Sequence, residues 1–121
     1  MITDALKTLI ATHLKDTLFD SAKIGLGGNS TNPTATDLDV PLTSITPSVI
    51  ITNSDLNVIE VKVSVAGNSI QGQVIREVGL FRDTGLSSPN DKEMVYRANF
   101  DGVGPFSTTE TLELFILLEV E

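Results

Sequence analysis

The side chains that could take part in chemistry are few and lie far apart in this sequence. His13 is the only histidine, and histidine is the side chain that ordinarily changes charge near neutral pH. It stands beside Leu9, Ile10 and Leu14, and no serine or acidic residue accompanies it at the spacing of a catalytic triad. We therefore predict that His13 is a structural residue at the edge of an apolar stripe, that the chain has no catalytic residue, and that it is not an enzyme.

Two further patterns match ligand-binding motifs only in part. The GLGG run at residues 25–28 begins like a dinucleotide-binding loop, but such loops lead into a helix, whereas this run leads into Asn32 and Pro33. Asp37 and Asp39 could offer two carboxylates to calcium, yet the later ligands of an EF-hand loop are missing. The absence of cysteine also removes thiolate ligands for zinc. We predict no cofactor site and no metal site.

Composition bears on the partners of the chain. Its 121 residues suit a single domain, 1–121. The net charge of −8 comes from 8 Lys and Arg against 16 Asp and Glu, and an acidic surface repels a phosphate backbone. The first residues lack the long apolar run of a membrane span or signal peptide. We expect no nucleic-acid partner, no membrane and no secretion by that route.

Hydrophobic periodicity divides the chain into three parts. Residues 1–20 predict an amphipathic helix, because apolar residues recur at steps of three and four; Thr3 can cap its start, and Asp4 suits the first turn. Residues 21–47 are rich in Gly, Pro, Ser and Thr and predict a long loop, of the kind usually held by a partner or used for contacts. Residues 48–121 predict strands. The apolar helix residues are Ile2, Leu6, Leu9, Ile10, Leu14 and Leu18.

The strand patterns predict an antiparallel β-sandwich with one N-terminal helix. Residues 58–65 alternate between apolar and polar side chains, as expected of a strand with one buried face. Residues 94–100 alternate again after a turn signal and should form a hairpin with the strand at 73–81. A last strand at residues 112–120 completes a set with no helical pattern between its members.

Two of these strands carry more apolar residues than one covered face requires. At 73–81 both faces are apolar, so we predict that Arg76 and Glu77 are buried polar residues, each with its own partner. At 112–120, Phe115 and Leu117 stand behind the core-facing leucines. We expect the helix or another subunit to cover these second faces. The candidate assembly residues are Phe115, Leu117, Leu6, Ile10 and Leu14.

The sequence IREVGLF at residues 75–81 resembles the "EvGLf" strand of tail-fibre, tail-collar and baseplate-type proteins of tailed phages. The surrounding order is similar too, with KIGLGG at 23–28, a Thr/Pro-rich stretch at 32–37 and VYRANF at 95–100. The likeness covers roughly residues 23–100. In such fibres this stretch usually precedes a shaft, and the sequence given ends at Glu121, so the expectation shifts toward an adaptor, a baseplate piece or a head decoration protein.

The resemblance implies a structural protein of the virion, without enzymatic activity and commonly oligomeric. It leads us to expect a homo-oligomer, with a trimer as one option, that also binds other virion proteins in the tail, baseplate or fibre-attachment region. A head decoration protein is the first alternative. A free-standing ligand- or carbohydrate-binding sandwich is the second, although one Tyr and no Trp leave little aromatic surface for stacking on sugars.

The acidic charge generates a direct prediction. The purified protein should not shift duplex or single-stranded DNA at about 0.15 M salt, because its charge opposes contact with phosphates. An electrophoretic mobility assay checks this, and binding in the micromolar range would contradict it.

Overall fold

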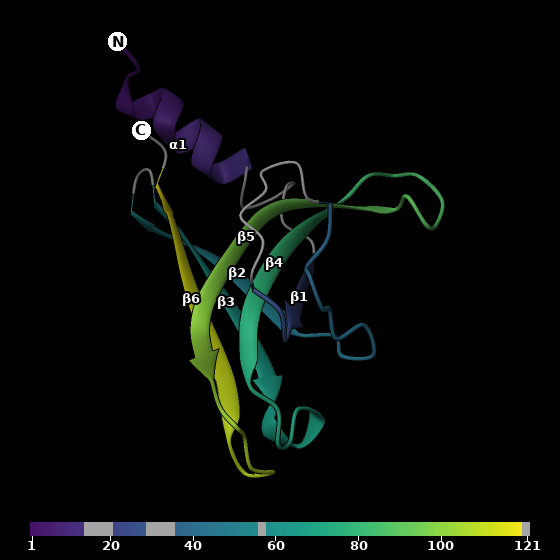
Figure 1. Ribbon diagram of the computed structural model, residues 1–121. Helices are drawn as coiled ribbons and strands as arrows, with labels where there is room; N and C mark the ends of the chain where they lie inside the picture. Colours follow the sequence, from purple (N-terminus) through teal and green to yellow (C-terminus); the bar gives the residue numbers. More distant parts are fainter. Residues whose placement is uncertain (14–20, 29–35, 56–57, 120–121) are drawn as a thin grey trace.

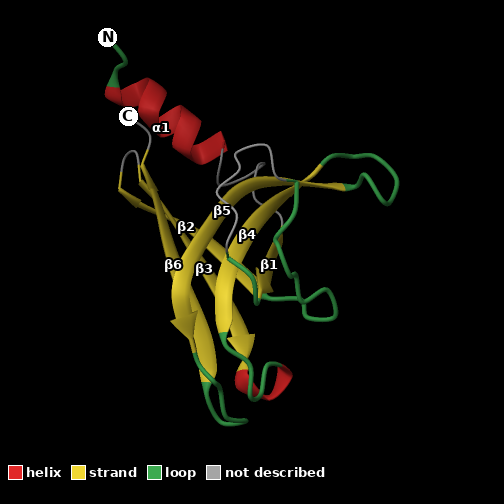
Figure 2. Ribbon diagram, viewed as in Figure 1, coloured by secondary structure: helices red, strands yellow, loops and turns green. Residues whose placement is uncertain are grey.

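The computed structural model describes residues 1–13, 21–28, 36–55 and 58–119, and confirms a mainly β fold. Among these residues, six strands form two antiparallel three-stranded sheets (Figures 1 and 2). Sheet A has the order β1-β4-β5, and sheet B has the order β2-β3-β6. The elements are α1 Asp4–His13, β1 Ser21–Gly25, β2 Ser48–Asp55, β3 Val58–Ala66, the 3-10 turn η2 Gly67–Ser69, β4 Ile75–Asp83, β5 Lys92–Val103 and β6 Thr111–Glu119.

The core lies between the two sheets and follows from the alternation along β3. Ile59, Val61 and Val63 are fully buried, and every second residue between them is only partly covered. Because the pairing of β3 with β6 is antiparallel and regular, Ile116 lies opposite Val61 and joins the same layer. Sheet A supplies the facing layer, made up of Ala22, Ile24, Ile75, Val78 and Leu80.

The predicted hairpin between residues 73–81 and 94–100 is confirmed by the antiparallel pairing of β4 with β5. Their register is interrupted twice, once between Ile75 and Glu77. The prediction that Arg76 is buried is wrong, because its side chain lies exposed at this interruption. Ile75, next to Arg76, belongs to the core. A β-bulge changes the direction of neighbouring side chains in this way.

The prediction of a continuous loop over residues 21–47 is also wrong. Residues 21–25 form β1, which pairs with β4 from Ser21 opposite Phe81 to Gly25 opposite Glu77. The strand is short and ends in glycine, so its composition is that of a turn. Its two core residues, Ala22 and Ile24, are nevertheless buried in the layer between the sheets.

The helix α1 lies beyond one end of the sandwich (Figure 1). Thr3 caps it as predicted: its Oγ1 accepts a long hydrogen bond of 3.4 Å from the backbone N–H of Leu6. Ala11 is buried, whereas Leu6 and Leu9 are exposed. The apolar stripe of α1 is therefore not fully covered within the described part of the chain, and the predicted continuation to residue 20 lies outside it.

Candidate functional site

The segment at residues 37–42, which we call the strap, runs along the edge of β1 that β4 does not use. The backbone N–H of Leu26 donates to the carbonyl of Val40 at 3.0 Å, and the N–H of Leu42 donates to the carbonyl of Ile24 at 2.9 Å. Pro41 lies opposite Gly25 as an isolated bridge. The strap thus covers the outer face and edge of sheet A, where either the helix or another subunit was expected.

Glu77 anchors the strap from β4. Its cross-strand neighbour is Gly25, which has no side chain, so the carboxylate can lie across β1 toward the strap. There Glu77 Oε1 accepts a hydrogen bond of 3.2 Å from the backbone N–H of Val40. Glu77 is 0% exposed and is the one charged residue in the interior among those the structure describes. Its burial agrees with the two-sided pattern of the strand.

The glycines near Glu77 make room for this carboxylate. A Cβ atom at Gly25 would lie 2.6 Å from Glu77 Oε1, and one at Gly27 would lie 2.5 Å from Glu77 Oε2. Neither distance is compatible with a real side chain. The run at residues 25–28 begins like a dinucleotide-binding loop, but in this chain its glycines have a structural role. Gly25 and Gly27 leave space for the buried side chain of Glu77.

Arg97 on β5 supplies the countercharge, and it was not among the predicted site residues. Its Nη2 lies 2.9 Å from Asp39 Oδ2 in the strap and 3.9 Å from Glu77 Oε2. The side chain is only 11% exposed. Arg97 Nη2 meets the distance of an ion pair but not the geometry of a hydrogen bond, and Glu77 Oε2 likewise has no hydrogen-bond donor among the described residues. The contact is therefore mainly electrostatic, and it offsets part of the cost of burying the carboxylate.

Leu38 supplies the apolar part of the attachment. It is 5% exposed and lies over Gly79, where an added Cβ would meet Leu38, Phe81 and Met94 at 3.1 to 3.3 Å. Burying a leucine contributes about 1.5–3 kcal/mol. The half-exposed ion pair of Lys23 with Asp37, at 3.3 Å, contributes about 0–1 kcal/mol. The packing of Leu38 therefore holds the strap down, and the polar contacts fix its position.

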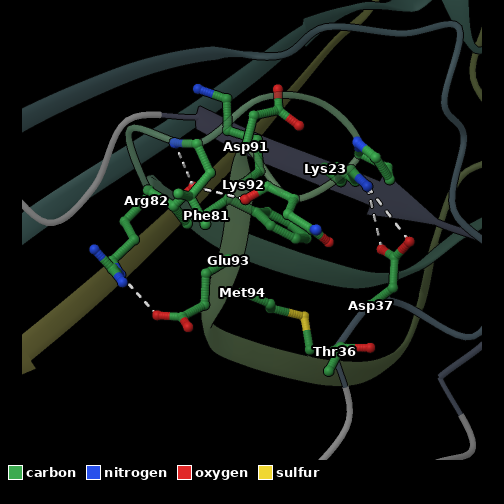
Figure 3. Close-up of a pocket in the computed structure, with 13 residues that line it drawn as sticks. Lys23, Thr36, Asp37, Phe81, Arg82, Asp91, Lys92, Glu93 and Met94 are labelled. Carbon is green, nitrogen blue, oxygen red and sulfur yellow. Dashed lines mark hydrogen bonds and ion pairs between the residues drawn. The ribbon is translucent and has the colours of Figure 1, made fainter.

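An open hollow of about 860 Å³ lies beside the strap, between β1, β4 and the loop that joins β4 to β5 (Figure 3). Two of its cations already have acidic partners, since Lys23 contacts Asp37 and Arg82 Nε lies 2.6 Å from Glu93 Oε1. Phe81 lies under Lys23 and is 3% exposed, so its ring offers no open face for a sugar. Two ion pairs and a covered aromatic ring therefore account for part of the lining of the hollow.

Asp37 and Asp39, the two carboxylates considered above for calcium, are engaged with protein groups. Asp37 Oδ1 accepts a hydrogen bond of 2.8 Å from the N–H of Leu38, and Asp39 faces Arg97. Within the described residues, no three His, Cys, Asp or Glu side chains gather where they could hold a metal ion. No helix in the same ranges is long and apolar enough to cross a membrane.

The outer face of sheet B carries an exposed apolar strip, formed by Ile50, Phe115 and Leu117. These residues are 54%, 58% and 66% exposed, so neither α1 nor the strap covers them. Lys62 stands between Ile50 and Phe115 across the sheet and pairs with Glu113 at 3.5 Å. Large exposed apolar side chains grouped on one face indicate a contact surface.

The other predicted assembly residues lie on or beyond α1. Leu6 is exposed and Ile10 is half-buried, whereas Leu14 lies outside the described residues. His13 is exposed at the end of the helix as the structure describes it. Leu6 and Ile10 lie one helical turn apart on the same side of α1.

No protein-family model matches the chain, and no curated protein sequence matches it. A functional proposal therefore rests on the geometry of the strap and of the apolar strip, together with the resemblance carried by residues 23–100.

Replacing Glu77 by Ala should lower the free energy of unfolding by roughly 1–3 kcal/mol, because the N–H of Val40 loses its acceptor and Arg97 loses one counterion. Chemical denaturation measures the change. Glu77→Gln keeps an oxygen acceptor for the N–H of Val40, so its free energy of unfolding should fall by less. Glu93→Ala removes only an exposed ion pair and should lower the free energy of unfolding by about 1 kcal/mol or less. An unchanged stability of Glu77→Ala would show that the carboxylate does not hold the strap.

Gly25→Ala should destabilise the protein by about 1–3 kcal/mol, because the added methyl group would meet both Glu77 Oε1 and the carbonyl oxygen of Val40 at 2.6 Å. Thermal unfolding checks this, with Thr43→Ala on the exposed surface as the control. A melting temperature equal to that of the wild type would mean that the strap can move aside without cost.

Proposed function

We propose that the protein is a structural subunit of a tailed-phage virion, in the tail, baseplate or fibre-attachment region. It acts by associating with copies of itself and by binding neighbouring virion proteins. Its alternative position is on the head, as a decoration protein. The observation that carries the proposal is the exposed apolar strip of Ile50, Phe115 and Leu117, since such a surface is the kind that subunits bury on assembly.

Segments that carry the resemblance meet at the strap. Gly25 and Gly27 accommodate Glu77, Gly79 accommodates Leu38, and Arg97 balances the charge. In this chain these segments therefore have one common purpose, which is to hold Glu77 and the strap against sheet A. This purpose is structural and adds no chemistry.

The same contacts favour a role without catalysis. The acidic groups Glu77, Asp37 and Asp39 each bind a group of the strap or of sheet A, and they are used to hold the chain together. A carbohydrate-binding role is not favoured, because the hollow beside the strap exposes almost none of Phe81.

Immunogold labelling of intact virions with antibodies against the protein tests the proposal. Label confined to the tail or baseplate is expected, and label over the capsid would select the decoration alternative. A virion role would be rejected if intact particles carried no label at either place and denatured particles contained no protein of this mass.

Phe115→Asp should leave a folded protein that no longer associates, because a charge replaces an apolar group that is 58% exposed in the single chain. Apolar anchors at interface centres typically contribute about 2 kcal/mol or more, so the mass measured by light scattering should fall. Ala66→Asp adds the same charge to the same face of sheet B, four residues along β3 from Lys62 and away from the strip, and should associate normally. If the mutant protein unfolds, Phe115 is needed for the stability of the single chain and not for association.

A further inference from the structure

Among the described residues, no strand or bridge pairs with the edge of β6 that faces away from β3. Its register with β3 runs without interruption through nine pairs, from Val58 opposite Glu119 to Ala66 opposite Thr111. It contains no Pro, Gly or Lys. Sheet edges in soluble proteins are normally protected by such residues, by bulges or by a covering segment, because their unpaired N–H and C=O groups attract other strands.

The other sheet edges in the described residues have protection of this kind. The edge of β1 is paired with the strap. The register of β2 shifts between Asn53 and Asp55. The register of β5 with β4 is interrupted twice. Of the four edges, β6 is therefore the one that invites a partner strand.

We propose that this partner is the β6 strand of a second copy of the chain, paired antiparallel about a two-fold axis at Phe115. Phe115 is the midpoint of Thr111–Glu119, so this register pairs all nine residues of the strand with the second copy. On the outer face, Phe115 meets Phe115 of the second copy, and Leu117 meets Glu113. On the inner face, the leucines and Ile116 meet one another.

The charges on β6 select this register over its neighbours. A two-fold axis at Ile116 would put Glu113 directly opposite Glu119 twice, and like charges directly opposite each other destabilise a sheet. An axis at Leu117 would shorten the pairing to residues 115–119 and put Phe115 against Glu119. The axis at Phe115 gives the longest pairing and brings no two acidic residues opposite each other.

The resulting dimer would join two copies of sheet B into one six-stranded sheet. Its outer face would carry both apolar strips side by side, which turns two small surfaces into one larger platform for a neighbouring virion protein. This inference rests on the proposed self-assembly and specifies how it occurs. A two-fold pairing of this kind is closed at two copies.

Cysteine cross-linking tests the register directly, because the chain has no cysteine of its own. Glu113→Cys and Leu117→Cys proteins should form a disulfide when the two are mixed and mildly oxidised, since these positions lie opposite each other. Each variant alone should not cross-link, because its two thiols would lie four residues apart along the strands, about 14 Å. Cross-linking of Leu117→Cys alone, or no cross-linking in the mixture, would overturn the register.

Two lysine variants separate edge pairing from association through the outer face alone. Leu117→Lys places the lysine opposite Glu113 of the second copy and should keep the dimer. Phe115→Lys places two lysines opposite each other and should raise the dissociation constant about tenfold or more. Equal weakening by both variants would reject edge pairing in favour of face-to-face contact.

Analytical ultracentrifugation of the wild-type protein gives the stoichiometry. A dimer is expected, and a trimer, or a monomer at about 1 mM, would overturn the inference. Either of those results would leave the virion role standing, because immunogold labelling does not depend on β6. A dimer in solution together with unlabelled virions would reject the proposed function instead.

Discussion

One constraint governs the outer face of sheet A: the carboxylate of Glu77 is buried, and it accepts a hydrogen bond from the N–H of Val40. A carboxylate with no exposed surface is costly unless it is paired, so its surroundings must be arranged to suit it. Gly25 must lack a side chain, Arg97 must lie near enough to balance the charge, and the strap must present its backbone. Removing any of these would leave a buried charge or a steric clash.

The strap explains why the two sheets differ on their outer faces. On sheet A the chain covers itself, with Leu38 filling the space above Gly79 and the edge of β1 paired by backbone hydrogen bonds. On sheet B no described segment does the same for Phe115 and Leu117. In the described part of the chain the outer face of sheet B is therefore open, and the same sheet contains the edge strand β6. Both features therefore point to the same side as the place of assembly.

Alternation was sufficient to predict β3, β5 and β6, because each contrasts a core face with an opposite face. The apolar residues on both faces of β4 predicted that strand and placed Glu77 in the interior. Alternation could not reveal β1, since a five-residue strand ending in glycine has the composition of a turn. It missed the strap and Arg97, because their contacts join residues 40 and 77, or 39 and 97, and no local pattern encodes such pairs. Arg76 was misplaced because periodicity assumes an unbroken register.

The acidity of the chain also affects how copies associate. A net charge of −8 makes copies repel one another at long range, which opposes indiscriminate association through an exposed strand edge. Within β6 the acidic residues Glu113 and Glu119 penalise one of the neighbouring registers at short range. The axis at Phe115 avoids that penalty and pairs the strand along its full length. Charge thus acts here as a filter on how copies meet, while the contact of Phe115 with Phe115 of the second copy supplies apolar attraction.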